Sequence, residues 1–135
     1  MYRKIIHDLK RWKYSPHRKP LILQGARQTG KTWIMKEFGK TEYKNTAYLF
    51  CQENPALESL FNAPFSKERL LNGFQILCGF KIEPENTLII FDEIQEIPTA
   101  LTALKFLYEQ APDYHIICAG SLLGIAFHKD ISFPV

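Results

Sequence analysis

Four short runs of apolar residues recur along this chain, and each has the length of a β-strand. They cover residues 21–23, 46–51, 87–91 and 114–119. Because these runs are apolar almost throughout, instead of alternating with polar residues, they are typical of strands whose two faces are both buried. Such strands belong to parallel sheets that carry helices on both sides.

The segments between these runs show the spacing of amphipathic helices. Near the N-terminus, apolar side chains recur every three or four residues, at Ile5, Ile6, Leu9 and Trp12. The same spacing and the cap residues predict helices over residues 2–14, 30–38, 55–61, 66–79 and 98–108, with Gly39 near a C-cap and Ser66 as an N-cap.

Strands that alternate with helices predict an α/β fold, here a three-layer sandwich around a mainly parallel sheet. The chain has 135 residues, which is about the size of one domain. We therefore expect residues 1–135 to form a single domain. Residues 1–19 should be an N-terminal helix and a linker, because Pro16 and Pro20 cannot continue a helix.

The first apolar run leads directly into a glycine-rich loop. This loop matches the pattern G-x-x-x-x-G-K-[ST] in full, with Gly25, Ala26, Arg27, Gln28, Thr29, Gly30, Lys31 and Thr32. Glycine lets the backbone curl so that its N–H groups converge on phosphate oxygens, and the following helix adds the positive end of its dipole. Lys31 would supply positive charge to the β- and γ-phosphates, and the Thr32 hydroxyl can ligate Mg²⁺. The pattern predicts a nucleoside triphosphate site, and the dinucleotide pattern G-x-G-x-x-G is absent.

Two adjacent carboxylates, Asp92 and Glu93, end the third apolar run. Ligands bind at the carboxyl ends of parallel strands, so Asp92 should face the same edge as the glycine-rich loop. Asp92 is a candidate for holding Mg²⁺, and Glu93 can accept a proton from a water aimed at the γ-phosphate. This pairing favours hydrolysis by water over phosphoryl transfer to a small molecule. The simpler interpretation, a strand end that only begins a turn, is disfavoured by the complete loop upstream.

The fourth apolar run ends in Gly120 and Ser121. In P-loop ATPases with an additional central strand, a polar residue at this place senses the γ-phosphate. Ser121 is therefore a candidate catalytic residue beside Lys31 and Glu93, although it could equally cap a helix over residues 122–127. Arg27, inside the loop, could contact phosphate, a partner subunit or solvent.

Charge and cysteine content limit the binding partners and the cellular compartment that we expect for the protein. Residues 1–40 hold 11 Lys and Arg against 2 Asp and Glu, whereas residues 41–135 hold 6 against 12. The basic third could attract nucleic acid, and a solvated helix face explains it more simply. The three cysteines form no CxxC pair, which indicates reduced thiols and a cytoplasmic protein. No apolar run approaches the roughly 18 residues of a membrane span, so we expect no membrane partner.

With these motifs in view, the chain resembles the prokaryotic AAA-type P-loop ATPases that carry an uncharacterised, often nuclease-like C-terminal domain. The similarity rests on the strings at residues 25–32, 48–55, 91–98 and 119–124. It implies that residues 25–32 bind ATP, that Thr32 and Asp92 hold Mg²⁺, and that Glu93 activates water. It also implies a five-stranded sheet in the order 5-1-4-3-2.

Members of that family continue past the equivalent of Val135, through a fifth strand, a helical lid and the C-terminal domain. The present chain therefore resembles a truncated form that lacks the fifth strand and the lid. Without a lid there is no arginine finger, and ATP hydrolysis should be weak. The missing C-terminal regions would form the contacts of a homo-oligomer or of a complex with a partner protein.

The main hypothesis is an ATP-hydrolysing module of a larger AAA-type protein, with ATP and Mg²⁺ as cofactors. A second is a nucleotide-dependent switch that binds ATP with little hydrolysis, and a third is a nucleic-acid-associated module. A P-loop kinase is weaker, because nothing marks a pocket for a second substrate. GTPases usually show Asn/Thr-Lys-x-Asp and Asp-x-x-Gly, and neither string occurs.

Overall fold

The computed structural model describes residues 2–24 and 30–120 of the chain. Its elements, in chain order, are α1 (Tyr2–Lys13), β1 (Leu21–Gln24), α2 (Lys31–Glu42), β2 (Asn45–Phe50), α3 (Pro55–Asn62), α4 (Lys67–Cys78), β3 (Thr87–Asp92), the 3-10 turn η1 (Ile94–Glu96), α5 (Thr99–Gln110) and β4 (His115–Gly120). All four apolar runs form strands, and every helix expected within the described residues is present. The turn η1 was not foreseen from the sequence.

The described strands form one parallel sheet in the order β1-β4-β3-β2. This confirms the α/β prediction and agrees with the 1-4-3-2 part of the expected strand order. Because all these strands run the same way, their carboxyl ends meet at one edge. Gln24 pairs with Gly120 there, and Phe50 pairs with Asp92.

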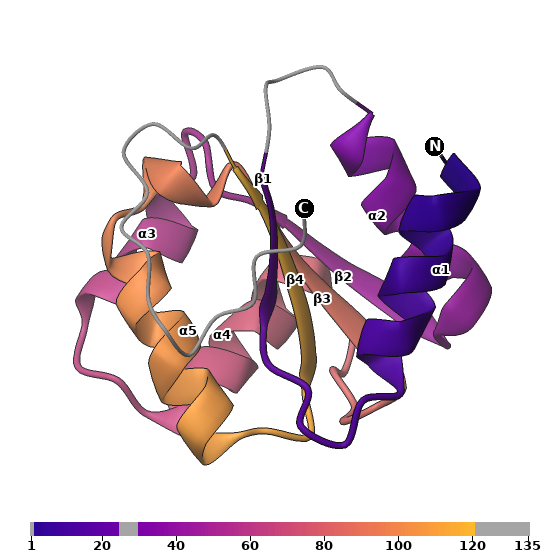
Figure 1. Ribbon diagram of the computed structural model, residues 1–135. Helices are drawn as coiled ribbons and strands as arrows, with labels where there is room; N and C mark the ends of the chain where they lie inside the picture. Colours follow the sequence, from indigo (N-terminus) through magenta and orange to yellow (C-terminus); the bar gives the residue numbers. More distant parts are fainter. Residues whose placement is uncertain (1, 25–29, 121–135) are drawn as a thin grey trace.

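Helices cover both faces of the sheet, which gives the expected three layers (Figure 1). Alternate side chains of β3 supply both interfaces, and no residue of that strand is more than 3% exposed. Leu88 and Ile90 pack in the cluster that includes Leu9 of α1 and Phe38 of α2. Ile89 and Phe91 face α3, α4 and α5, where Phe91 meets the edges of the Phe61 and Phe74 rings. Continuous apolar runs are needed because both faces of the strand are buried.

One helix boundary differs from the prediction. Gly39 lies inside α2, which continues to Glu42, and it is not a C-cap. A Cβ at this position would collide with the Thr46 side chain on β2. The glycine therefore serves the close approach of helix to strand. Ser66, by contrast, caps α4 as expected, because its hydroxyl accepts the Arg69 N–H at 3.3 Å.

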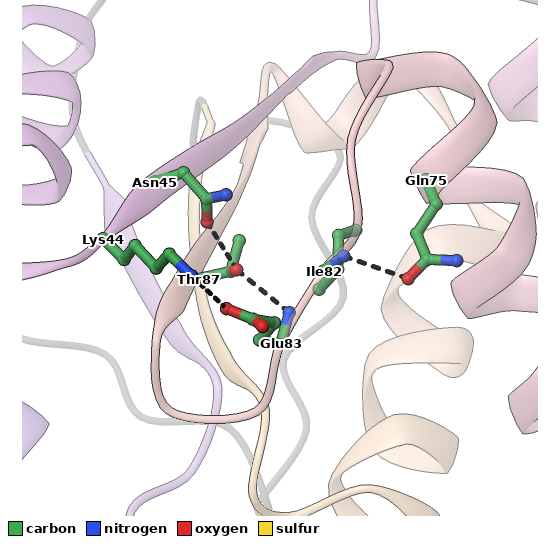
Figure 2. A network of polar contacts seen from close by, with 6 residues as sticks. All are labelled: Lys44, Asn45, Gln75, Ile82, Glu83 and Thr87. Atoms are coloured by element: carbon green, nitrogen blue, oxygen red, sulfur yellow. Dashed lines mark hydrogen bonds and ion pairs between the residues drawn. The ribbon is translucent and has the colours of Figure 1, made fainter.

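The amino-terminal edge of the sheet is held by a polar network around Thr87 (Figure 2). The buried Thr87 hydroxyl donates to Asn45 Oδ1 at 2.6 Å and accepts the Glu83 N–H at 3.0 Å. Lys44 reaches Glu83 at 3.4 Å, and Gln75 of α4 accepts the Ile82 N–H at 2.9 Å. These bonds fix the connection from α4 to β3 and satisfy the buried hydroxyl.

A buried histidine lies at the same edge, at the start of β4. His115 is 3% exposed, its Nδ1 lies 2.6 Å from the Tyr43 hydroxyl, and its Nε2 has no hydrogen-bond partner. Trp12 and Tyr43 meet the imidazole edge-on. Burial, together with the nearby positive charges of Arg18 and Lys13, lowers the pKa of His115 to about 4. The folded chain therefore favours neutral imidazole.

Acid should consequently destabilise the fold through His115. Because the folded pKa lies below the unfolded value near 6.5, the unfolded state binds the proton first as the pH falls. The free energy of unfolding should drop by about 1.4 kcal/mol for each pH unit below about 6.5, until the folded state also titrates. Between pH 7 and pH 5 the wild type should lose about 2 kcal/mol more than His115→Phe, as measured by urea unfolding. Equal losses in both proteins would contradict this assignment.

Candidate functional site

The N-terminus of α2 points to the carboxyl edge of the sheet, directly after the glycine-rich loop. Gly30 caps the helix with φ of 82° and ψ of 8°, a left-handed conformation that favours glycine. Its carbonyl accepts the Ile34 N–H at 3.0 Å. The helix thus begins at Lys31, where the positive end of the helix dipole favours an anion.

Asp92, the last residue of β3, is the buried acid at this edge and is 3% exposed. Its Oδ2 accepts hydrogen bonds from the Thr32 and Tyr48 hydroxyls, each at 2.6 Å. Its Oδ1 accepts the Glu93 N–H at 3.0 Å. Both carboxylate oxygens are therefore engaged, which offsets the cost of burying a charged group.

Lys31 and Glu93 complete the group of charged side chains. The Lys31 ammonium lies 3.5 Å from the carbonyl oxygen of Gly120, at the carboxyl end of β4. Burial lowers the pKa of Lys31, while Glu93 and Asp92 oppose that shift. One cation and two carboxylates thus share a partly desolvated edge, where their interactions are stronger than in water.

The backbone at Glu93 turns out of the sheet in the left-handed region, with φ of 55° and ψ of 48°. This conformation costs a residue with a side chain about 1–2 kcal/mol. Glu53 and Glu85 also have positive φ, so the conformation alone does not distinguish Glu93. What distinguishes Glu93 is its place directly after Asp92. Its Oε1 accepts a hydrogen bond from Gln95 Nε2 at 2.7 Å, which orients the carboxylate.

The structure therefore brings together four of the residues that the sequence singled out, namely Lys31, Thr32, Asp92 and Glu93. Gly30 is also at this edge. The remaining candidates lie outside the described residues; they are Gly25, Ala26, Arg27, Gln28, Thr29 and Ser121. The roles of all these residues stay predictions.

Two residues of the site were not recognised from the sequence, Tyr48 and Gln95. Tyr48 belongs to the same face of the sheet as Asp92, because β2 pairs with β3 in a register that sets Tyr48 beside Ile90. That pairing depends on the strand order. A tyrosine within an apolar run was the available signal, and it gains meaning only once β2 is known to lie beside β3.

Cys51 lies next to the acidic pair without being reactive. Its backbone N–H donates to the Asp92 carbonyl at 2.9 Å, and its side chain is buried. Burial, with the nearby charges of Asp92 and Glu93, raises the pKa of the Cys51 thiol to about 12. At neutral pH it is therefore a protonated thiol, which is a poor nucleophile.

The chemistry of this edge fits a magnesium-bound polyphosphate. In the described part of the chain, no group of three or more His, Cys, Asp or Glu side chains is arranged to hold a metal ion. Mg²⁺ usually takes one or two carboxylates and completes its shell with water and substrate phosphates. The Thr32 hydroxyl and the Asp92 carboxylate offer such oxygens at 2.6 Å from each other. The start of α2 and Lys31 offer donors and positive charge to phosphate.

The chain is similar to known proteins in both sequence and fold. The family model described as "AAA domain" matches residues 17–133. Among solved structures, PCH-2 from C. elegans is similar in fold, with a TM-score of 0.59 and 13% sequence identity. The similarity covers 98% of this chain and 41% of the PCH-2 chain, so this chain spans less than half of that protein. No curated protein shows significant similarity to the chain. Within residues 2–24 and 30–120, no helix is both long and apolar enough to cross a bilayer.

Proposed function

Because this chain belongs to the AAA domain family, a class of ATP-binding module, we propose that it binds ATP with Mg²⁺ and hydrolyses it as part of a larger protein. The observation that carries this proposal is the 2.6 Å hydrogen bond between Thr32 and Asp92, which are 60 residues apart in the sequence. It joins the residue that ends the glycine-rich loop to the acid that ends β3. A magnesium ion shared by the two side chains would require their oxygens to lie this close together.

Each described side chain has a distinct task in this proposal. Lys31 neutralises the β- and γ-phosphates, and the positive end of the α2 dipole faces them. Thr32 and Asp92 hold the metal, which would screen phosphate charge as the bond to the γ-phosphoryl group breaks. Residues 25–29 would wrap the phosphates with backbone N–H groups, and Arg27 would add a further contact.

Glu93 is proposed as the general base that accepts a proton from the attacking water. Its carboxylate is oriented by Gln95 and lies on the turn that follows Asp92. Lys31 and Glu93 interact electrostatically, since the negative charge of Glu93 opposes the lowering of the Lys31 pKa by burial. Ser121, following β4, would contact the γ-phosphate between the two motifs.

Titration of the chain with ATP and with GTP, in the presence and absence of Mg²⁺, tests this proposal directly. Saturable, magnesium-dependent ATP binding supports it. An absence of ATP binding under both conditions would contradict it. A preference for GTP would show that the nucleotide carries guanine instead of adenine. The same proposal includes two features of the larger protein that the family resemblance implies. These are assembly into oligomers and a neighbouring nuclease-like domain.

A second candidate is suggested by the exposed face of α1. Four basic side chains and one histidine are exposed along this helix, at Arg3, Lys4, His7, Lys10 and Arg11. Its opposite face is used for packing, since Leu9 and Trp12 are buried. Lys10 also pairs with Glu42 of α2 at 3.6 Å. The stripe offers positive charge to a phosphate backbone, which makes the chain a nucleic-acid-associated module in this alternative.

Salt dependence would reveal this second function. Single-stranded DNA should bind at low salt, and the affinity should fall with a log–log slope of about −0.7 for each phosphate contacted. Replacing Arg3, Lys4 and Arg11 together by Glu should remove this binding while ATP affinity stays unchanged. DNA that fails to bind the wild type at low salt, or that binds the triple variant equally well, excludes the stripe.

A further inference from the structure

We propose that Tyr48 is a positioning residue that fixes the Asp92 carboxylate in the orientation that holds Mg²⁺. The inference rests on the proposed function, because it assigns Tyr48 a part in the same site. It goes beyond that function by adding a residue of β2, a strand that contributes no residue to the site predicted from the sequence. Asp92 would then be oriented by the sheet itself and not only by the helix that follows the loop.

The strand register places Tyr48 within reach of Asp92. Tyr48 pairs with Ile90 across the β2–β3 ladder, and Asp92 lies two residues further on the same face. The Tyr48 hydroxyl therefore extends toward the end of β3, where its oxygen is 2.6 Å from Asp92 Oδ2. This separation is typical of a charge-assisted O–H···O⁻ bond, which is roughly twice as strong as a neutral one.

The three donors to Asp92 are not equivalent. Thr32 belongs to α2, and its hydroxyl donates to Asp92 Oδ2; in the proposed function it would be one of the groups that hold the metal. Tyr48 and the Glu93 N–H come from the sheet and its immediate continuation, one on each carboxylate oxygen. These two bonds orient both oxygens of the carboxylate. They would not depend on the Thr32 hydroxyl.

The ring of Tyr48 is itself held in place. The Lys36 ammonium of α2 lies 4.0 Å from the centre of the Tyr48 ring, so the ring is contacted from the helix side. The Tyr48 hydroxyl is the donor of the bond to Asp92 Oδ2, because an ionised carboxylate can only accept.

Groups that orient metal ligands typically contribute 10- to 100-fold to metal affinity. A purely structural role for Tyr48 would instead lower ATP affinity equally with and without metal. A third possibility is competition, in which Tyr48 occupies an oxygen that the metal needs. Its removal would then lower the Mg²⁺ concentration required. The three roles differ in the direction of one measurable quantity, the dependence of ATP affinity on free Mg²⁺.

The test compares Tyr48→Phe with the wild type in ATP titrations over a series of free Mg²⁺ concentrations. The substitution keeps the ring and removes only the hydroxyl. We expect ATP affinity without Mg²⁺ to stay within about twofold, and the Mg²⁺ concentration for half-maximal enhancement to rise about tenfold. Tyr43→Phe is the matched control, because it also loses a 2.6 Å hydroxyl contact, to His115 at the opposite edge of the sheet.

Three results would overturn the inference. They are an unchanged Mg²⁺ dependence in Tyr48→Phe, a lowered Mg²⁺ requirement, and an equal loss of ATP affinity with and without the metal. A wild-type chain that binds no ATP would overturn the proposed function, and this inference with it. That outcome is distinguishable, because the other three require magnesium-dependent binding by the wild type.

Discussion

Lys31→Ala should weaken ATP binding by about 100-fold, equivalent to about 2.7 kcal/mol. The wild-type ammonium lies at the start of α2, 3.5 Å from the Gly120 carbonyl and close to two carboxylates. Hydrogen bonds to charged groups contribute about 1.5–3 kcal/mol each. Without Lys31, the γ-phosphate would approach Asp92 and Glu93 without the positive charge of the ammonium beside it. Calorimetric titration of ATP with Mg²⁺ measures the loss.

The same variant should not destabilise the chain without nucleotide. Burial lowers the pKa of Lys31, because desolvation disfavours the charged form, and the attraction to Glu93 and Asp92 opposes this. Since the two effects oppose each other, the melting temperature of Lys31→Ala should be close to that of the wild type, which separates a binding defect from misfolding. Lys40→Ala is the control, since Lys40 is an exposed lysine in the last turn of the same helix. If both variants bind ATP as the wild type does, Lys31 has no part in a phosphate site.

The strands could be predicted from the sequence, because a strand that is buried on both faces is a continuous run of apolar residues. In β3 every residue is buried, so the run from Leu88 to Phe91 had to be apolar at each position. The place of Asp92 followed from chain direction alone, since parallel strands end at one edge. Thr32 and Asp92 could be assigned to one site in this way without any knowledge of which strands are neighbours.

Side-chain contacts between neighbouring strands could not be predicted, because the sequence alone does not give the strand order or the register. Tyr48 meets Asp92 only because β2 lies beside β3 in one particular register, and a one-residue slip would send its ring to the other face. Gly39 was taken for a cap because helix-ending glycines are common, whereas here it allows α2 to approach Thr46. The isolated His115 carried no pattern, and its burial depends on Trp12 and Tyr43.

Glu93→Gln should abolish most ATP turnover while leaving ATP affinity nearly intact. General bases contribute about 10²- to 10⁴-fold to rate, so turnover should fall at least about 100-fold. Glutamine has the same shape, can still bond to Gln95 and loses only the ability to accept the proton. Lys31, Thr32 and Asp92 are unaltered, so affinity should change less than about threefold, because they and not Glu93 hold the phosphates and metal. Steady-state phosphate release and ATP titration separate the two quantities.

Glu85→Gln is the control that matches the backbone of Glu93. Glu85 has φ of 69°, close to the left-handed conformation of Glu93, and it precedes β3 at the opposite edge of the sheet. Its substitution should leave turnover unchanged, which shows that an amide in a strained turn is harmless by itself. Equal turnover in the wild type and Glu93→Gln would remove Glu93 from the reaction. A wild type that binds ATP tightly without turnover would favour the nucleotide-dependent switch, because binding requires Lys31, Thr32 and Asp92 whereas hydrolysis also requires the base.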